Sequence, residues 1–521
     1  MGARVVVIGA GIGGLTSAAL LAARGDDVTV LEKEAWVGGK ARRVVVDGAE
    51  IDGGPTVFTY REIFDEVFAA CGASLEDHVK VTRADVIARH AWDDGAHLDL
   101  YANRDRSIDA VADFAGRDAA QGYRRFTREA KRIFDVLEKP FLRGDKASTP
   151  LPMIWRMGLW RIGDALAMRP FDGMWKALGQ HFKDRRLQQL FGRYATYCGS
   201  SPFSAPATLM LIAHVEARGV WLIKGGIHAL ATAIAGLAER HGARVRTDAA
   251  VAEVLTADGR ASGVRLASGE VIAADVVICN GDPGALASGR LGEAARRAVP
   301  SIPPAKRSLS ALVWYAHAKT QGFDLSHHNV FFSRDYAREF HEIGEGRTPS
   351  EPTVYVCAMD RGASDHSTPS RGARERLQII VNAPANGDVQ HYTTEERDRC
   401  THAMMATLKR CGLQLEDPLP HQLMTPQDWE ALFPATGGAL YGRASHGWAA
   451  SFQRQGPKTR LPGLYCTGGA THPAAGVPMA ALSGQLAARV IAKDLASMKL
   501  SRPAAIAGGM STQSATTGST G

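Results

Sequence analysis

The stretch VVVIGAGIGG, residues 5–14, decides the fold of this chain. Its first four residues form a β-branched apolar run, which is typical of a buried parallel strand. The glycines that follow, Gly9, Gly11, Gly13 and Gly14, match the pattern G-x-G-x-x-G. A small-residue helix is predicted over residues 15–24 and a second strand over residues 28–31, which completes a βαβ unit. Such glycines permit a tight turn, approach of the backbone to a pyrophosphate and close packing of helix on strand, so we predict a dinucleotide site.

An acidic residue, Glu32, follows the second predicted strand. A carboxylate at this position can accept hydrogen bonds from ribose hydroxyls, and it would repel the additional phosphate of NADP. We therefore assign Glu32 and its neighbour Lys33 to the cofactor site. The alternative is the glycine-rich turn of some other α/β protein with a surface glutamate. The strand, the turn, the helix and the acidic residue occur here together, and this combination favours the dinucleotide site.

The run Gly38-Gly39-Lys40-Ala41-Arg42 comes directly after the acidic residue. Paired glycines bring the backbone close to a cofactor, and a nearby cation can balance pyrophosphate charge. This combination resembles the glycine-pair motif of the amine oxidase and phytoene desaturase superfamily, which implies FAD rather than NAD. Many members have Arg in place of Lys40, and Lys lacks the bidentate fork of Arg. Whether Lys40 or Arg42 meets phosphate therefore stays open, and a solvated cation in a turn is the alternative for both.

Residues 464–478 are predicted to form a strand, a glycine turn and the start of a helix. Such a segment offers backbone N–H groups to a flavin ring or ribityl chain. It resembles the C-terminal signature of the same superfamily, in which the chain returns to the N-terminal unit. The resemblance implies cofactor contacts from Gly468, Gly469, Gly476, Val477 and Pro478. It also matches Val251, which begins a predicted edge strand, to the position whose backbone meets adenine, although a plain core valine is the alternative.

The chain resembles the bacterial carotenoid desaturases over all but its C-terminal tail. The resemblance rests on residues 52–58, which contain Gly54, Pro55 and Thr56, on residues 197–202 and on Thr471-His472-Pro473. Within that family, the chain is most similar to the hydroxyneurosporene desaturases, and residues 54–59 and 88–92 carry this closer resemblance. This implies an FAD-dependent enzyme that introduces a 3,4 double bond into lipophilic 1-hydroxy or 1-methoxy acyclic carotenoids of the spheroidene or spirilloxanthin type.

Other functions use the same scaffold, since a fold does not define a substrate. A phytoene desaturase is one alternative, and an amine or protoporphyrinogen oxidase with a polar substrate is another. A non-catalytic FAD- or NAD-binding protein is the third. Because no second G-x-G-x-x-G motif precedes a helix, a stable NAD(P)H site is not expected, and oxygen or a membrane quinone remains open as the electron acceptor.

The expected chemistry needs little acid–base machinery. A flavin can take a hydride from a carbon atom, and the polyene delocalises the resulting positive charge until a proton leaves next door. The protein must position the bond and exclude water. His472 is the candidate catalytic residue, either as proton acceptor or as a support of its loop, and Asp52 is more plausible as a hydrogen-bond acceptor within its loop.

The seven scattered cysteines and the absence of a metal-ligand spacing predict neither a disulfide framework nor a metal site. The net charge is +7, and no motif for nucleic acid is recognisable. No secretory signal and no apolar run long enough to span a bilayer appear, so we expect a cytoplasmic chain. Residues 153–190 mix Trp, Met, Lys and Arg at helical spacing. They predict peripheral contact with the inner, intracytoplasmic membrane, or alternatively a helical lid with a solvated basic face.

The predicted fold class is α/β: a Rossmann-like FAD-binding domain of the amine oxidase and phytoene desaturase type, an interleaved β-sheet substrate domain, and a helical membrane-associated subdomain. The FAD-binding parts are predicted at residues 1–106, 216–290 and 431–497. The helical subdomain is predicted at residues 107–215, the substrate domain at 291–430, and a disordered tail at 498–521, which is rich in Ser, Thr, Gly and Ala.

Overall fold

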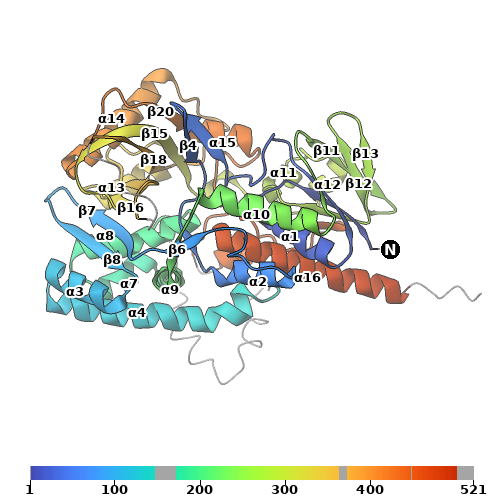
Figure 1. The fold of residues 1–521 in the computed structure, drawn as a ribbon, viewed down its shortest axis with the longest axis horizontal. Helices are drawn as coiled ribbons and strands as arrows, with labels where there is room; N and C mark the ends of the chain where they lie inside the picture. The colour runs from blue at the N-terminus through green and yellow to red at the C-terminus, as the bar shows by residue number, and fades with distance from the viewer. Residues whose placement is uncertain (1, 147–171, 363–371, 448, 502–521) are drawn as a thin grey trace, which may run out of the picture.

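The computed structural model describes residues 2–146, 172–362, 372–447 and 449–501 (Figure 1). A parallel sheet with its covering helices lies on the right of Figure 1, a larger mixed sheet at the upper left, and a group of helices at the lower left. The glycine turn belongs to the first of these parts, and a mainly apolar cavity, described below, lies where the three meet.

Five short apolar strands form the parallel sheet, in the order β10-β2-β1-β14-β21. All neighbours in it pair in parallel. The strands are β1 (Arg4–Ile8), β2 (Asp27–Leu31), β10 (Arg244–Arg246), β14 (Val276–Cys279) and β21 (Leu464–Cys466). Their continuous apolar runs suit a sheet that is covered on both faces. Three distant parts of the chain therefore build one sheet, and the carboxyl ends of β1, β14 and β21 meet at one edge.

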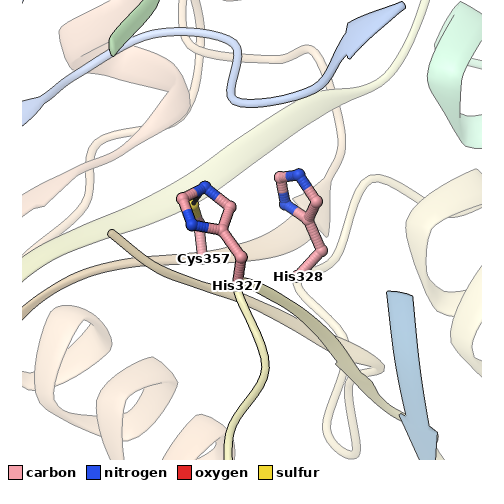
Figure 2. A group of neighbouring side chains, drawn as sticks. All are labelled: His327, His328 and Cys357. Carbon is pink, nitrogen blue, oxygen red and sulfur yellow. Dashed lines mark hydrogen bonds between the residues drawn. The ribbon is translucent and has the colours of Figure 1, made fainter. Parts of the chain in front are cut away.

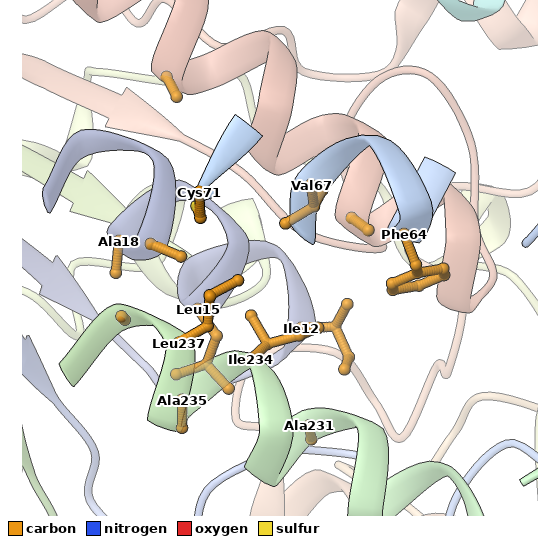
Figure 3. Packing of buried hydrophobic residues seen from close by; sticks show 14 of the residues in the cluster. Ile12, Leu15, Ala18, Phe64, Val67, Cys71, Ala231, Ile234, Ala235 and Leu237 are labelled. Atoms are coloured by element: carbon orange, nitrogen blue, oxygen red, sulfur yellow. The ribbon is translucent and has the colours of Figure 1, made fainter. Parts of the chain in front are cut away.

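Helices cover one face of this sheet: α1 (Ile12–Ala23) contacts both α10 (Gly226–Arg240) and α16 (Val477–Ser501), and α2 (Glu62–Ala70) packs alongside. Figure 3 shows Ile12 and Leu15 of α1 facing Ile234 and Leu237 of α10 in a buried cluster. The glycines and alanines of α1 leave it almost without a polar face, and its buried surroundings agree with that composition.

The opposite face is covered by a small antiparallel sheet of β11 (Val251–Ala257), β12 (Arg260–Leu266) and β13 (Val271–Ala273), together with α11 (Pro283–Ala287) and α12 (Glu293–Arg296). Val254 and Val264 pack there against Val6 and Val277 of the parallel sheet. The parallel sheet is thus buried between two layers.

The larger sheet has the strand order β19-β15-β18-β17-β16-β7-β8, and β20 also pairs with β15. Only β16 and β7 pair in parallel among the described strands of this sheet; the other pairs are antiparallel. Trp314, Ile379 and Met404 lie in the core between this sheet and α14. The strands are β7 (Val86–Ala91), β8 (His97–Tyr101), β15 (Ser310–Gly322), β16 (His328–Phe331), β17 (Val354–Ala358), β18 (Arg374–Ala383), β19 (Leu413–Leu415) and β20 (His421–Met424), and the associated helices are α13 (Tyr336–Gly344), α14 (Thr394–Arg410) and α15 (Pro426–Leu432).

The helical part packs on the face of the larger sheet opposite α14. Its core surrounds Phe126, Phe182 and Phe191, whose rings contact one another. Its elements are α3 (Arg104–Ala115), α4 (Arg117–Leu137), the π-helical turn η1 (Glu138–Leu142), α7 (Met174–His181), α8 (Arg185–Gly192), the 3₁₀ turns η3 (Arg193–Cys198) and η4 (Ala207–Met210), and α9 (Leu211–Arg218). In the described part of the chain, no helix combines the length and the apolar character that a bilayer crossing requires.

Short elements complete the fold. They are the hairpin β3 (Arg43–Val46) and β4 (Ala49–Asp52), the strands β5 (Phe58–Thr59), β6 (Val81–Arg83) and β9 (Val220–Ile223), and the turns η5 (Pro304–Lys306) and η6 (Ala450–Gln453). β9 pairs with both β5 and β6 and so connects the helical part to the loop that follows the hairpin.

The α/β class with a Rossmann-like unit is confirmed. The elements predicted over residues 5–31 are present within a few residues at their ends. The sequence also indicates helices over residues 227–241, 395–411 and 478–495 and a strand over residues 276–279, and all four are present, with the last helix continuing to Ser501. The pattern of residues 187–196 indicates a single helix, but α8 ends at Gly192 and a 3₁₀ turn continues to Cys198. Within the segment 1–106, β7 and β8 join the larger sheet rather than the parallel one. Residues 153–171 of the proposed membrane element, and 502–521 of the tail, lie outside the described residues.

Candidate functional site

The glycine turn between β1 and α1 is fixed by contacts that leave no room for side chains. Gly9 has a φ of +94°, and its N–H donates to the carbonyl of Leu31 at 2.7 Å. A Cβ added to Gly13 would lie 2.8 Å from Cα of Gly468 and 2.9 Å from Oδ1 of Asn280. A Cβ on Gly11 would meet Nδ2 of Asn280 at 2.7 Å, and one on Gly14 the carbonyl of Gly9 at 2.4 Å. The turn therefore leaves its N–H groups at the start of α1 next to two other loops, as a pyrophosphate cradle requires.

Glu32 is buried directly behind this turn. Its carboxylate accepts hydrogen bonds from the N–H of Ala10 at 2.7 Å and of Glu34 at 3.1 Å. Burial raises the pKa of Glu32, and the two N–H donors oppose that shift. The carboxylate thus supports the turn and retains lone pairs for a ribose. Lys33 faces away and pairs with Glu34 at 2.9 Å.

The paired glycines lie against the first turn. The N–H of Gly38 donates to the carbonyl of Ala10 at 2.8 Å, and a Cβ on Gly39 would lie 3.2 Å from Cα of Gly11. The two cations that follow point toward the larger sheet. Nζ of Lys40 donates to the carbonyl of Leu440, and burial lowers its pKa to about 8.

Arg42 is also buried, and its guanidinium lies 5.6 Å from the centre of the Trp429 ring. Its Nε and Nη2 find no acceptor among the residues that the structure describes. These are the orphaned donors that a bound anionic group would satisfy, so Arg42 fits a phosphate contact better than Lys40, whose ammonium already has an acceptor.

Residues 53–56 link the cofactor region to the larger sheet. The carbonyl of Gly53 accepts from the Tyr315 hydroxyl at 2.7 Å, and that of Gly54 from Nε2 of Gln378 at 2.8 Å. The Thr56 hydroxyl lies 2.6 Å from that of Tyr355. Pro55 and Thr56 are therefore held on the wall of the cavity. Asp52 accepts from the N–H groups of Ile227 and His228 at the start of α10, which agrees with its expected role as an acceptor.

The C-terminal segment returns to the glycine turn as its sequence predicts. Gly468 has a φ of +110° and contacts Asn280, and Gly469 follows in the same turn. The Thr471 hydroxyl lies 2.7 Å from that of Ser483 in α16, which secures the turn to this helix. Residues 473–479, which contain Gly476, Val477 and Pro478, line the cavity at the N-terminus of α16.

His472 is buried beside this cavity, but its ring turns elsewhere. Its Nε2 lies 3.2 Å from the carbonyl oxygen of Gly144, and its ring meets that of Phe141 edge-on at 5.2 Å. The described residues that line the cavity include its neighbour Pro473 and do not include His472 itself. This placement favours the loop-supporting role over that of a proton acceptor.

Val251 begins β11 and is half-buried against the core on the outer face of the parallel sheet. Its position beside Ala249 and Ala250, whose backbone groups pair with Glu32 and Ala267, keeps its backbone near the acidic end of β2. Both the adenine contact and the core packing remain compatible with this position.

A cavity of about 300 Å³ joins residues 55–59, residues 473–479, the helical part and the larger sheet. Most of its wall is apolar, for example Leu137, Phe141, Leu209, Ile212 and Val215. Such a lining suits a hydrocarbon and excludes water. Buried polar residues, among them Arg193, Tyr336 and Arg454, also contribute to the wall.

His328 in β16, its neighbour His327 just before this strand, and Cys357 in β17 come together (Figure 2). One ligand atom of each lies within 4.8 Å of the others, although the sequence predicted no metal site. Nδ1 of His327 lies 2.7 Å from the carbonyl of Arg361, and Nδ1 of His328 lies 2.7 Å from the Tyr355 hydroxyl. Burial raises the pKa of the Cys357 thiol and lowers that of His328. These directions favour the neutral thiol of Cys357, which lies 3.5 Å from Nε2 of His327, whereas metal ligation would need a thiolate.

Sequence reasoning missed two residues of the site. Asn280 was predicted only as part of the loop 280–283, which follows a buried strand and was expected near the cofactor. Its side chain lies beside Gly9, Gly11, Gly13 and Gly14 and donates to the carbonyl of Gly9 at 3.2 Å. Arg454 is buried and ties the carbonyls of Tyr441 and Gly469 together. The place of Asn280 at the carboxyl end of a central strand was an available signal, whereas nothing local singles out Arg454.

Comparison with known proteins identifies the family to which the chain belongs. The profile of the flavin containing amine oxidoreductases matches residues 12–492. A hydroxyneurosporene desaturase of Rubrivivax gelatinosus is 51% identical over 99% of this chain and 98% of its own length. Another of Cereibacter sphaeroides is 44% identical over 95% of this chain and 98% of its own length.

Among solved structures, an oxidoreductase from Methanosarcina mazei superposes with a TM-score of 0.61 at 16% identity, covering 94% of this chain and 100% of its own, which shows the common fold. The glycine cradle and the orphaned donors of Arg42 fit the cofactor, FAD. The chain belongs to the family of flavin-containing amine oxidoreductases.

Proposed function

We propose that this chain is an FAD-dependent desaturase that introduces a C3–C4 double bond into acyclic 1-hydroxy or 1-methoxy carotenoids, such as 1-hydroxyneurosporene and methoxyneurosporene, in carotenoid biosynthesis. The observation that carries the proposal is the largely apolar cavity that meets residues 55–56 and 476–478, the segments expected at the flavin. The names of the two relatives, which align along nearly their whole length, support the same substrate class.

Bound FAD supplies the acceptor for a hydride that leaves a carbon atom. The chain contributes placement: the apolar wall holds the polyene and excludes water, while Thr56 and Tyr355 fix the loop that borders the expected flavin position. The substrate would lose a hydride and a proton, and bound FAD would take up both to become FADH2. Because the polyene spreads the positive charge that develops, no strong base is needed in the wall. His472 then acts by holding residues 471–473 against η1.

The same proposal assigns roles to the predicted segments. Residues 1–106, 216–290 and 431–497 supply the FAD site, residues 291–430 the β-sheet wall, and residues 107–215 the helical wall. The substrate is insoluble in water, so we place the protein at the surface of the inner membrane, with the basic face of the helical segment toward anionic lipid. Oxygen or a membrane quinone serves as the electron acceptor.

A panel of substrates tests this function. Purified holoenzyme would be incubated with 1-hydroxyneurosporene, neurosporene and phytoene in liposomes, and the length of the polyene read from its absorbance. We expect a longer chromophore with the hydroxylated substrate. Conversion of phytoene alone would identify a phytoene desaturase, and a flavin that is reduced by amines but not by carotenoids would identify a polar-substrate oxidase.

A further inference from the structure

Part of the cavity wall is polar. Arg193, Thr196, Tyr197 and Glu216 come from η3 and α9, and Tyr336 comes from the start of α13. Both Arg193 and Tyr336 are at least nineteen-twentieths buried, with exposed fractions of 5% and 4%. In a wall that otherwise suits a hydrocarbon, such groups need partners.

Within this polar patch the acid already has its partners. The carboxylate of Glu216 accepts hydrogen bonds from the hydroxyls of Tyr194 and Tyr197, the second at 3.0 Å. The negative charge of Glu216 also offsets the positive charge of Arg193. The guanidinium of Arg193 lies 5.0 Å from the centre of the Tyr197 ring. The patch is therefore close to neutral, which matters beside a substrate that becomes positively charged.

Two donors in the patch remain unused. Nε of Arg193 and the hydroxyl of Tyr336 make no hydrogen bond to any described residue. The Tyr336 ring is held in place by Phe340 at 5.0 Å and Trp175 at 6.1 Å, so the hydroxyl has a defined position. Two unpaired donors on residues that line a hydrophobic cavity predict an oxygen acceptor on the ligand, because a buried donor without an acceptor is unfavourable.

The substrate of the proposed function carries one such oxygen. In a 1-hydroxy or 1-methoxy carotenoid, the oxygen at C1 is three bonds from C3, one end of the bond that is oxidised. An oxygen site must therefore lie close to the flavin, and the cavity that contains Arg193 and Tyr336 also contains Pro55, Thr56 and residues 476–478. Both a hydroxyl and a methoxy oxygen accept hydrogen bonds, whereas only the hydroxyl donates one.

We infer that Arg193 and Tyr336 form a binding site for the C1 oxygen of the carotenoid and position the C3–C4 bond at the flavin. This inference rests on the proposed function, which it deepens. Because the site offers donors, it accepts the hydroxyl and the methyl ether alike and selects against hydrocarbons that lack the oxygen.

The variant Tyr336→Phe removes only the unused hydroxyl and should not disturb folding. We expect kcat/KM for 1-hydroxyneurosporene and for methoxyneurosporene to fall by about tenfold, the effect of one lost hydrogen bond in a dry site. Binding of neurosporene, which lacks the oxygen, should stay within about twofold. Dissociation constants follow from the quenching of tryptophan fluorescence by the polyene, since Trp175 lies beside Tyr336.

Tyr392→Phe is the matched control, because Tyr392 is a buried tyrosine in the core between the larger sheet and α14. It should leave all three ligands unaffected, and both variants should retain the flavin absorbance of the wild type. Arg193→Lys keeps the charge but removes the Nε donor, and we expect it to weaken the two oxygenated ligands selectively as well.

The possible failures are distinguishable. A wild-type enzyme that converts none of the oxygenated carotenoids would refute the proposed function. A wild-type enzyme that converts them, together with a Tyr336→Phe variant that treats all three ligands as the wild type does, would overturn the oxygen site alone. An equal loss of affinity for all three ligands would also overturn it, because the effect of the Tyr336 hydroxyl would then not depend on the C1 oxygen.

Discussion

At Gly13 the glycine turn, the loop after β14 and the turn after β21 come within contact distance. The glycine is needed here less for its backbone freedom than for the space that its missing Cβ leaves to Asn280 and Gly468. The same interpretation applies to Gly11, whereas at Gly9 the positive φ of the tight turn is the reason.

For Gly13→Ala we expect a loss of bound flavin, because the added methyl group would push apart the loops that form the cradle at a cost of about 1–3 kcal/mol. The ratio of flavin to protein absorbance in the purified protein measures this loss. Gly236→Ala is the control: it lies inside α10 with no atom within 4 Å of the added Cβ. That variant should keep its flavin and gain about 0.5–1 kcal/mol of stability. Equal flavin content in the two variants would contradict the prediction.

Protonation of the Asp52 carboxylate makes the stability of the protein depend on pH. Burial raises its pKa to about 7 against the opposing N–H donors of Ile227 and His228. The folded protein therefore binds the proton more tightly than the unfolded chain, and the free energy of unfolding should fall as the pH rises from about 4 to 7. Asp52→Asn should reduce this change in the free energy of unfolding between about pH 4 and 7 by on the order of 1–3 kcal/mol. Melting temperatures between pH 4.5 and 7.5 test it, with Asp258→Asn in the exposed β11–β12 turn as the control. An unchanged slope in Asp52→Asn would refute this account.

His472→Ala separates support from catalysis. Loss of its contact with the Gly144 carbonyl and with Phe141 should destabilise the protein by roughly 1–3 kcal/mol while turnover continues. Thermal unfolding and steady-state kinetics on flavin-matched samples measure the two effects. A variant that keeps its flavin and stability but loses kcat would instead make His472 the proton acceptor.

Among the elements, α16 combines two tasks. Its N-terminus lines the cavity at residues 476–479, and its middle packs on α1 where Gly484 meets the carbonyl of Gly13. The Ser17 hydroxyl, which lies 3.2 Å from the carbonyl of Gly484, closes the same contact. The last helix of the described residues thus packs against the glycine turn and supports it.

Gly484→Leu should separate these helices, because a Cβ at this position would lie 2.5 Å from the Gly13 carbonyl and 2.8 Å from Cβ of Thr16. We expect a lower melting temperature and weaker flavin retention, both read during thermal unfolding from the release of flavin fluorescence. Gly179→Leu on the exposed side of α7, where nothing lies within 4 Å of the added Cβ, serves as the comparison. Similar behaviour of the two variants would argue against a supporting role of α16.

At the scale of the whole molecule, the net charge of +7 and the many Lys and Arg residues of the segment 153–190 are the grounds for expecting contact with an anionic surface. We expect the protein to float with anionic liposomes at low ionic strength and to dissociate as salt rises, because screening shortens the electrostatic range to about 8 Å at physiological ionic strength. Neutral liposomes are the control. A protein that stays in the lipid-free fraction under all conditions would exclude this mode of substrate access.

Much of the candidate cofactor site was predictable from the sequence. The G-x-G-x-x-G turn, Glu32 and the segment 464–478 lie in short runs whose spacing follows from local geometry, since a strand, a turn and a helix N-terminus need particular residues at fixed intervals. The parallel strands were recognisable because a strand buried on both faces is apolar throughout.

The tertiary structure alone decided how the remainder is arranged. Residues 86–101 join the larger sheet because of the register between β7 and β16, which no local pattern encodes. The burial of Arg42 beside Trp429, the turning of His472 away from the cavity and the grouping of Arg193 with Tyr336 depend on side chains far apart in the chain. Such contacts are set by packing between elements, whose distances and orientations exist only once the core has formed, whereas the glycine turn is determined by the residues within it.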